Sequence, residues 1–317
     1  MQKKDKKKFN IFDRTREKKG VDPGEVKDFR FRNFPRYFGR NFTKLMSVNL
    51  MFSFCCLPLI FLLLGMTGYF DAHAQAPVNS LYGTLYGTME LGQTNPVSLS
   101  LYGIVGVQYA TVRMTSVVTY ILYGLSLITV FTWGYANAGL AYVTRSMMRG
   151  DPVFVWQDFR HVIRKNKRQG MILGVLDALF IFLLIYDFLF FNVQAGQYLY
   201  GVLYFVSIFL IVVYAVMRFY MYLQLITFDL SIYKILKNSF IFVFLGLKRN
   251  VVGILLVLLM AGLNYVLFRG VFMPVAIVLP FVLTAACIGY TATYTAYPKI
   301  KEIMIDPYYQ SDTSEEN

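Results

Sequence analysis

Long apolar runs, separated by clusters of basic residues, limit this chain more than any other feature. Six of them are about 18 residues long or more, the length that marks a membrane-spanning helix. Only 15% of the residues are charged, whereas a soluble domain carries about 25%. We therefore predict an all-α, polytopic membrane protein with six transmembrane helices and amphipathic interfacial helices on the cytoplasmic side. The expected spans are 45–68, 118–146, 171–191, 198–228, 251–268 and 272–295.

The distribution of Lys and Arg predicts the orientation of these spans. Of the 31 basic residues, 28 fall in segments that this layout places inside, which is the cytoplasmic side by the positive-inside rule. Both termini are then cytoplasmic. The net charge of +13 does not point to nucleic acid, because 15 basic residues lie in the first 44 positions and no nucleic-acid-binding fold is visible. The expected partners of these charges are the lipid bilayer and the anionic lipids of its inner leaflet.

The chain divides into an arm, a membrane domain and a tail. Residues 1–37 are expected to form a basic, largely disordered cytoplasmic arm, residues 38–305 the six-span domain, and residues 306–317 an acidic disordered tail. An alternative for the arm is a segment that folds against a partner. Residues 70–117 are poor in Lys and Arg and are expected to be an extracytoplasmic insertion. Its Leu-Tyr-Gly repeats suit an interfacial aromatic layer with tight turns, and the alternatives are a small hairpin cap or a sugar-stacking surface.

The connection between the second and third spans combines two patterns. Small residues at 134, 136, 138, 139 and 141 give the second span a surface for close helix approach. Asp151 and Pro152 are expected to start an amphipathic helix, with the Asp at the cap and the Pro at the first helical position. That helix is expected to lie in the inner interface with its apolar side toward the lipid. The candidate interfacial or docking residues are Asp151, Trp156, Phe159, Arg160 and Arg164.

Three ionisable residues fall inside predicted spans, where each is costly unless it is paired or hydrated. Asp177 and Asp187 lie in the third span and Arg218 in the fourth. Adjacent antiparallel helices bring Asp177 and Arg218 to compatible depths, at 1.5 Å of rise per residue. Asp187 is offset by about 80° around the helix, so one arginine is not expected to serve both carboxylates. A structural ion pair is the favoured interpretation, and a transport pathway is the alternative.

Signals for catalysis are weak. The two histidines fall on opposite sides of the predicted membrane, and no HExxH, GxSxG or Walker motif is present. The three cysteines lie inside apolar runs without metal-ligand spacing. We expect a protein that is not an enzyme and that has no catalytic residue, cofactor or metal.

One stretch of the sequence resembles a known family. The run GYANAGLAYVTRSMMRGDPVFVWQDFRHVIRKNKRQG, with NLMFSFCCLPLI in the first span and FDLS to NS after the fourth, resembles the YesL-like family of bacterial integral membrane proteins, a domain of unknown function. The resemblance covers about residues 38–260 with gaps. This chain departs from it in its long outer insertion and its extended basic arm.

The resemblance implies a protein of the bacterial cytoplasmic membrane, often encoded near carbohydrate uptake and degradation functions. It favours a non-enzymatic accessory role beside an ABC-type sugar transporter, with permease subunits as partners. Neither residues 151–169 nor residues 229–249 match the coupling segment of an ABC permease. The alternative function is a small solute transporter or channel that uses Asp177, Asp187 and Arg218.

Overall fold

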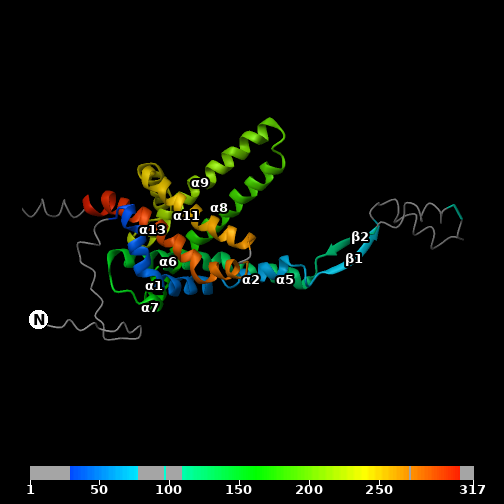
Figure 1. Cartoon of the computed structure of the whole chain (residues 1–317), viewed down its shortest axis with the longest axis horizontal. Helices are drawn as coiled ribbons and strands as arrows, with labels where there is room; N and C mark the ends of the chain where they lie inside the picture. The colour runs from blue at the N-terminus through cyan, green and yellow to red at the C-terminus, as the bar shows by residue number, and fades with distance from the viewer. Residues whose placement is uncertain (1–28, 78–95, 98–108, 271–272, 308–317) are drawn as a thin grey trace, which may run out of the picture.

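The computed structural model describes residues 29–77, 96–97, 109–270 and 273–307. Helices dominate these residues, and Figure 1 shows them as a bundle from which a two-stranded ribbon extends. Five helical stretches are long and apolar enough to cross a membrane, and a bent pair of helices makes a sixth. The predicted all-α polytopic membrane fold is confirmed. The helical elements are η2 (Phe31–Asn33), α1 (Phe34–Cys55), α2 (Leu59–Met66), α5 (Val117–Ser126), α6 (Ile128–Arg149), α7 (Val155–Lys165), α8 (Lys167–Val193), α9 (Tyr198–Thr227), α10 (Ile232–Leu245), α11 (Leu247–Arg269), α12 (Met273–Leu279), η3 (Pro280–Thr284), α13 (Ala285–Ile300) and η4 (Lys301–Ile305).

The first span is not the single helix that the sequence suggested. It is broken into α1 and α2, which meet at an angle of 66°. Pro58 lies in the break, where its missing N–H removes a helical hydrogen bond. The hydroxyl of Thr132 on α6 donates to the carbonyl of Cys55 at 2.7 Å, so the carbonyl that the break frees has a partner.

A second irregularity packs against α1 just before this break. Between α12 and α13 the chain makes one π-helical turn, η3, which begins at Pro280. Asn49 of α1 is fully buried, donates to the carbonyl of Pro280 at 2.9 Å and accepts from the N–H of Ala286 at 2.7 Å. Ser53 donates to the carbonyl of Phe281 at 2.9 Å. The polar side chains of α1 therefore satisfy the backbone groups that the π turn would leave unpaired.

The small-residue surface of α6 makes the close approach that its sequence predicts. A Cβ added to Gly174 of α8 would come within 2.4 Å of the backbone of Gly134, and one added to Gly134 would come within 1.9 Å of the carbonyl of Gly170. The two helices thus cross with backbone against backbone, as small-residue motifs allow in membranes. This crossing positions α8 against α6.

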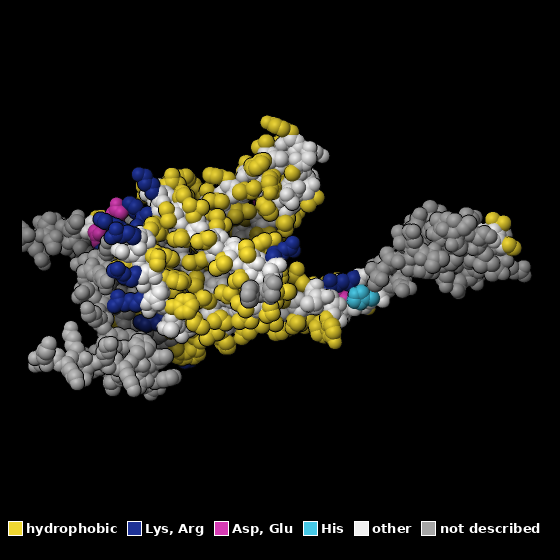
Figure 2. Space-filling model, in the orientation of Figure 1, with side chains coloured by type: hydrophobic (Ala, Val, Ile, Leu, Met, Phe, Trp, Pro, Cys, Tyr) yellow, Lys and Arg dark blue, Asp and Glu magenta, His cyan; other side chains and the backbone are white. Residues whose placement is uncertain are grey.

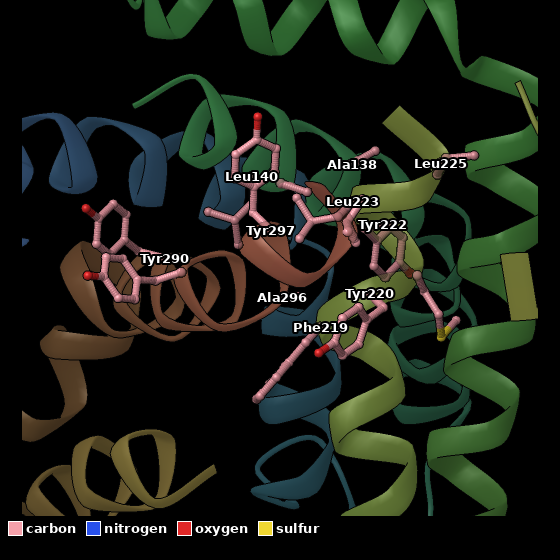
Figure 3. Packing of buried hydrophobic residues seen from close by; sticks show 14 of the residues in the cluster. Ala138, Leu140, Phe219, Tyr220, Tyr222, Leu223, Leu225, Tyr290, Ala296 and Tyr297 are labelled. Atoms are coloured by element: carbon pink, nitrogen blue, oxygen red, sulfur yellow. The ribbon is translucent and has the colours of Figure 1, made fainter. Parts of the chain in front are cut away.

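The buried core lies where α6, α9 and α13 meet. Figure 3 shows part of one buried cluster, to which Tyr220 and Tyr222 of α9, Ala138 and Leu140 of α6, and Tyr297 of α13 belong. Around this core the outward surface is hydrophobic, and Figure 2 shows Lys and Arg side chains gathered at one end of the hydrophobic body. An apolar belt with a charged end is the surface expected of a bilayer-embedded bundle.

The folded body begins before residue 38, within the segment that the sequence predicts as a largely disordered arm. Arg249 of α11 donates to the carbonyl of Phe29 at 3.1 Å and to the carbonyls of Tyr294 and Thr295 on α13, and its guanidinium lies 4.9 Å from the centre of the Phe31 ring. Residues 29–37 are therefore folded against α13, with α1 starting at Phe34. Residues 1–28, the Leu-Tyr-Gly repeats and the tail from residue 308 lie outside the described residues.

The two ends of the outer insertion pair as strands, whereas the sequence suggested a hairpin only as an alternative for the Leu-Tyr-Gly repeats between them. Strand β1 (Ala72–Pro77) pairs antiparallel with β2 (Tyr109–Met114), in a register that sets Ala72 opposite Met114. The ribbon leaves the body beyond α2 and α5 (Figure 1).

Candidate functional site

Asp177 is the centre of the most elaborate polar cluster among the described residues. It lies on α8, three residues after Gly174 of the glycine crossing, and its side chain is fully buried. Three neutral donors from neighbouring helices reach its carboxylate: the Trp133 indole N–H at 2.9 Å, the Tyr214 hydroxyl at 2.8 Å and the Tyr222 hydroxyl at 2.7 Å. These donors satisfy oxygen atoms that burial would otherwise leave without partners, which would be costly.

Arg218 completes the cluster. Its Nε lies 2.9 Å from Oδ1 and 3.2 Å from Oδ2 of Asp177, and its guanidinium carbon lies 5.5 Å from the centre of the Trp133 ring. The two residues that the depth argument suggested as a pair are thus brought together. Asn137 accepts a long hydrogen bond of 3.4 Å from Nη2 and itself donates to the carbonyl of Trp133.

Three members of the cluster were not anticipated from the sequence: Trp133, Tyr214 and Tyr222. A signal for two of them exists, because Tyr214, Arg218 and Tyr222 are spaced four residues apart and so lie on one side of α9. Tyrosines at such positions in a membrane helix also suit ordinary core packing. Only the contact with α8 shows that their hydroxyl groups converge on one carboxylate.

Asp187 does not join this cluster. It is half-buried near the outer part of α8, and the described residues include no hydrogen bond or ion pair that it makes. The 80° offset expected from helix geometry accounts for the separation. The three ionisable residues therefore form one pair and one separate carboxyl group, not a continuous polar path.

A cavity lies directly beside Arg218. Its volume is about 310 Å³. Side chains from five helices line it, and most of them are apolar. The apolar lining includes Phe52 of α1, Leu140 of α6, Ile254 of α11, and Ala285 and Ala292 of α13.

The Gly150-Asp151-Pro152 turn ends a helix, and the expectation that it starts one is wrong. Gly150 has a φ of +77°, and the N–H of Asp151 donates to the carbonyl of Ser146 at 3.1 Å, which together close α6. Helix α7 begins later, at Val155, where the Asp158 carboxylate accepts the N–H of Phe154 at 2.9 Å. Asp151 pairs instead with Arg149 at 3.3 Å.

Helix α7 also lies differently from the expectation of an apolar side in the lipid. Phe159 is 4% exposed, and a Cβ on Gly139 would meet its ring at 2.5 Å, so the apolar side packs on α6. Arg160 and Arg164 are exposed, as is Trp156, whose exposed fraction is 58%. These three residues are spaced by four and form one outward stripe of a helix that is fastened by its opposite side.

The described residues offer little for metal chemistry or catalysis. No group of three or more His, Cys, Asp or Glu side chains gathers there to hold a metal ion. The Asp177 cluster can fix the positions of α6, α8 and α9, since donors from α6 and α9 satisfy the carboxylate on α8. The cavity beside it can bind a small molecule.

Comparison with known proteins adds one match. A sequence family described as a protein of unknown function, DUF624, matches residues 95–188. The matched region contains α6, α7 and the part of α8 that carries Asp177. No curated protein matches the chain, and no solved structure matches it.

Proposed function

We propose that this chain is a non-enzymatic accessory protein for carbohydrate uptake, which docks through α7 on the permease subunit of an ABC-type transporter. In this proposal it is a multi-pass protein of the bacterial cytoplasmic membrane with both termini inside. One observation carries the docking step: α7 is anchored by Phe159 and presents Trp156, Arg160 and Arg164 outward. A large aromatic side chain flanked by arginines on a fixed helix is typical of protein-binding surfaces.

The charge distribution supports the orientation. The Lys and Arg side chains gather at one end of the hydrophobic body in Figure 2, and the positive-inside rule assigns such an end to the cytoplasm. The YesL-like resemblance supports the link to carbohydrate uptake. It is centred on residues 134–170, which the unknown-function match also contains.

The interior supports a structural role for Asp177 more than a pathway for ions. Its carboxylate already accepts four donors, and Asp187 lies apart from it. The cavity beside Arg218 favours the alternative, a small solute transporter. Purified protein in liposomes distinguishes the two: a transporter moves solute alone, whereas an accessory protein does not.

The experiment for docking places a photo-crosslinking amino acid at residue 156 in living cells. Irradiation should attach a sugar ABC permease subunit to the chain. The matched control carries the same crosslinker at Tyr233, which is 73% exposed on α10 and should give much less of this product. Adducts with lipid alone, or equal permease adducts at both positions, would overturn the proposal.

A functional test accompanies the crosslink. Deletion of the gene should slow sugar uptake, and the wild-type chain should restore it. A chain with Arg160→Glu and Arg164→Glu should fail to restore uptake while it accumulates at the normal level, because both residues are exposed. Full rescue by this variant would remove α7 from the proposal.

A further inference from the structure

The cavity beside Arg218 is large enough for a bound molecule. Its walls come from α1, α6, α9, α11 and α13, and apart from the edge formed by Arg218 and Asn137 they are largely apolar. Its volume of about 310 Å³ is far larger than a single water, whose share of the liquid is about 30 Å³. Protein interiors are close-packed and contain few voids larger than a water molecule. The space between these helices is partly open to the surroundings of the bundle, so an apolar group can enter it and fill it.

The polar edge of the cavity has donors to offer. Arg218 gives its Nε to Asp177, but among the described residues its Nη1 has no partner and its Nη2 has only the 3.4 Å contact with Asn137. The side chain is 29% exposed, and it is one of the residues that line the cavity. Because only Nε contacts Asp177, the outer edge of the guanidinium, formed by Nη1 and Nη2, remains available. Two parallel N–H groups of this kind match a carboxylate.

The rest of the wall limits the head group to one small anion. No Lys or second Arg lines the cavity. The hydroxyl of Thr293, which also lines it, is already engaged with Thr144 at 2.8 Å and with the carbonyl of Gly289 at 2.9 Å. A phosphodiester with its glycerol would bury several polar atoms without partners, which is costly. A single carboxylate on one apolar chain leaves no such atom.

We propose that this cavity binds an unesterified acyl chain, with its carboxylate on the outer edge of Arg218 and its tail against Ile254 and Ala292. The site is separate from the docking surface on α7 and does not depend on the proposed function. Its ligand belongs to the class of fatty acids.

The test uses the full chain, purified in detergent, and the fluorescent fatty acid cis-parinaric acid. Ala292→Leu adds bulk to the cavity without touching the Asp177 cluster, and it should weaken binding about tenfold, as loss of apolar contact predicts. The control is Ala261→Leu on the exposed side of α11, which should bind like the parent. Equal affinity in Ala292→Leu and the parent would overturn the proposal, because the probe would then bind elsewhere.

Competition tests the head group. Unlabelled oleate should displace the probe, and its methyl ester should do so about tenfold less well because it lacks the charged acceptor. Arg218→Lys should reduce the difference in competition between the acid and the ester, since Lys offers a point charge without the paired N–H groups of Arg. Should that variant fail to fold, the comparison of acid with ester on the parent chain decides alone. An ester that competes as well as the acid, or a phosphatidylglycerol that competes better, would overturn the assignment of the carboxylate.

Discussion

Two buried aspartates in this molecule have similar sets of partners but different structural roles. Asp71 and Asp177 each have a fully buried side chain, an arginine about forty residues further along the chain, and donors from hydroxyl groups. Asp71 lies between α2 and β1, outside the apolar spans. Asp177 lies inside the bundle, where α6, α8 and α9 meet.

The partners of the two carboxylates explain the difference. Asp71 accepts from the Thr119 hydroxyl and from the backbone N–H of Ser116, the residue that caps α5. Arg113 donates to Asp71 and to the carbonyl of Gly65 on α2. This pair closes a local junction at the base of the ribbon. Asp177 instead takes its donors from side chains on two other helices. Breaking it therefore disturbs the packing of three long helices inside the bundle, whereas breaking the Asp71 pair disturbs the ends of α2, α5 and β2 at the base of the ribbon.

The largest expected effect comes from Arg218→Leu. It leaves Asp177 buried without its counter-charge, and removing one partner of a buried pair costs about 3–5 kcal/mol. We expect a lower folded yield and a lower melting temperature, measured by fluorescence-detected gel filtration of heated samples. Asp187→Asn is the control and should melt like the parent, because Asp187 stands apart from the cluster.

The double variant Asp177→Asn with Arg218→Leu should recover part of the loss, since neither charge is then stranded. If Arg218→Leu alone melts like the parent, the pair contributes nothing to stability and the contrast with Asp71 disappears.

The next effect tests whether the helix crossing holds Asp177 in place. Gly174→Ala puts a Cβ within 2.4 Å of the backbone of Gly134, and such overpacking costs about 1–3 kcal/mol. The same thermal assay measures it. Gly262→Ala, on α11 with nothing within 4 Å of the added Cβ, should cost nothing. Equal melting of the two variants would mean that α6 and α8 do not cross as closely as described.

Much of the bundle was predictable from the sequence, because hydropathy and the position of charges follow directly from the bilayer. Hydropathy and length located the spans, although the first begins at Phe34 and not at residue 45, and depth made a pair between Asp177 and Arg218 feasible without deciding it. The small residues of α6 correctly indicated a close crossing, although they did not identify α8 and its Gly174 as the partner.

What was missed depends on contacts between distant segments. Pro58 is a local signal for a break, but the 66° bend also rests on Thr132, 77 positions from Cys55. Asn49 was read as part of an apolar run, and its role appears only when α1 meets the π turn more than 230 positions later. The start of α7 was misplaced because Asp-Pro also follows the glycine that ends a helix, and the sequence alone does not distinguish the two uses.

The Asp71 junction should show its own signature in acid. The Thr119 hydroxyl, the Ser116 N–H and Arg113 together lower the pKa of Asp71 from 3.8 to about 2. A lowered pKa in the folded state means that the stabilisation is present above pH 3.8 and is lost as the pH falls toward 2. Hydrogen exchange at the start of α5 should therefore be slower in the parent than in Asp71→Asn at neutral pH, with the two converging across that interval. The exposed Glu302→Gln should exchange there like the parent at every pH; a constant difference between Asp71→Asn and the parent would refute the role of the carboxylate.

The smallest effect belongs to a third pair, Arg149 with Asp151, which serves as the surface reference for the other two. Its side chains are 51% and 44% exposed, so Asp151→Ala should change the free energy of unfolding by less than about 0.5 kcal/mol. Gly150→Ala should cost more than Asp151→Ala, at about 1 kcal/mol, because its φ of +77° disfavours a side chain. We expect this order of costs because the backbone conformation of Gly150 ends the helix, whereas the Asp151 carboxylate does not. If Asp151→Ala were the more damaging, the carboxylate would be acting as a helix cap after all, and exposure would no longer separate this pair from the two buried ones.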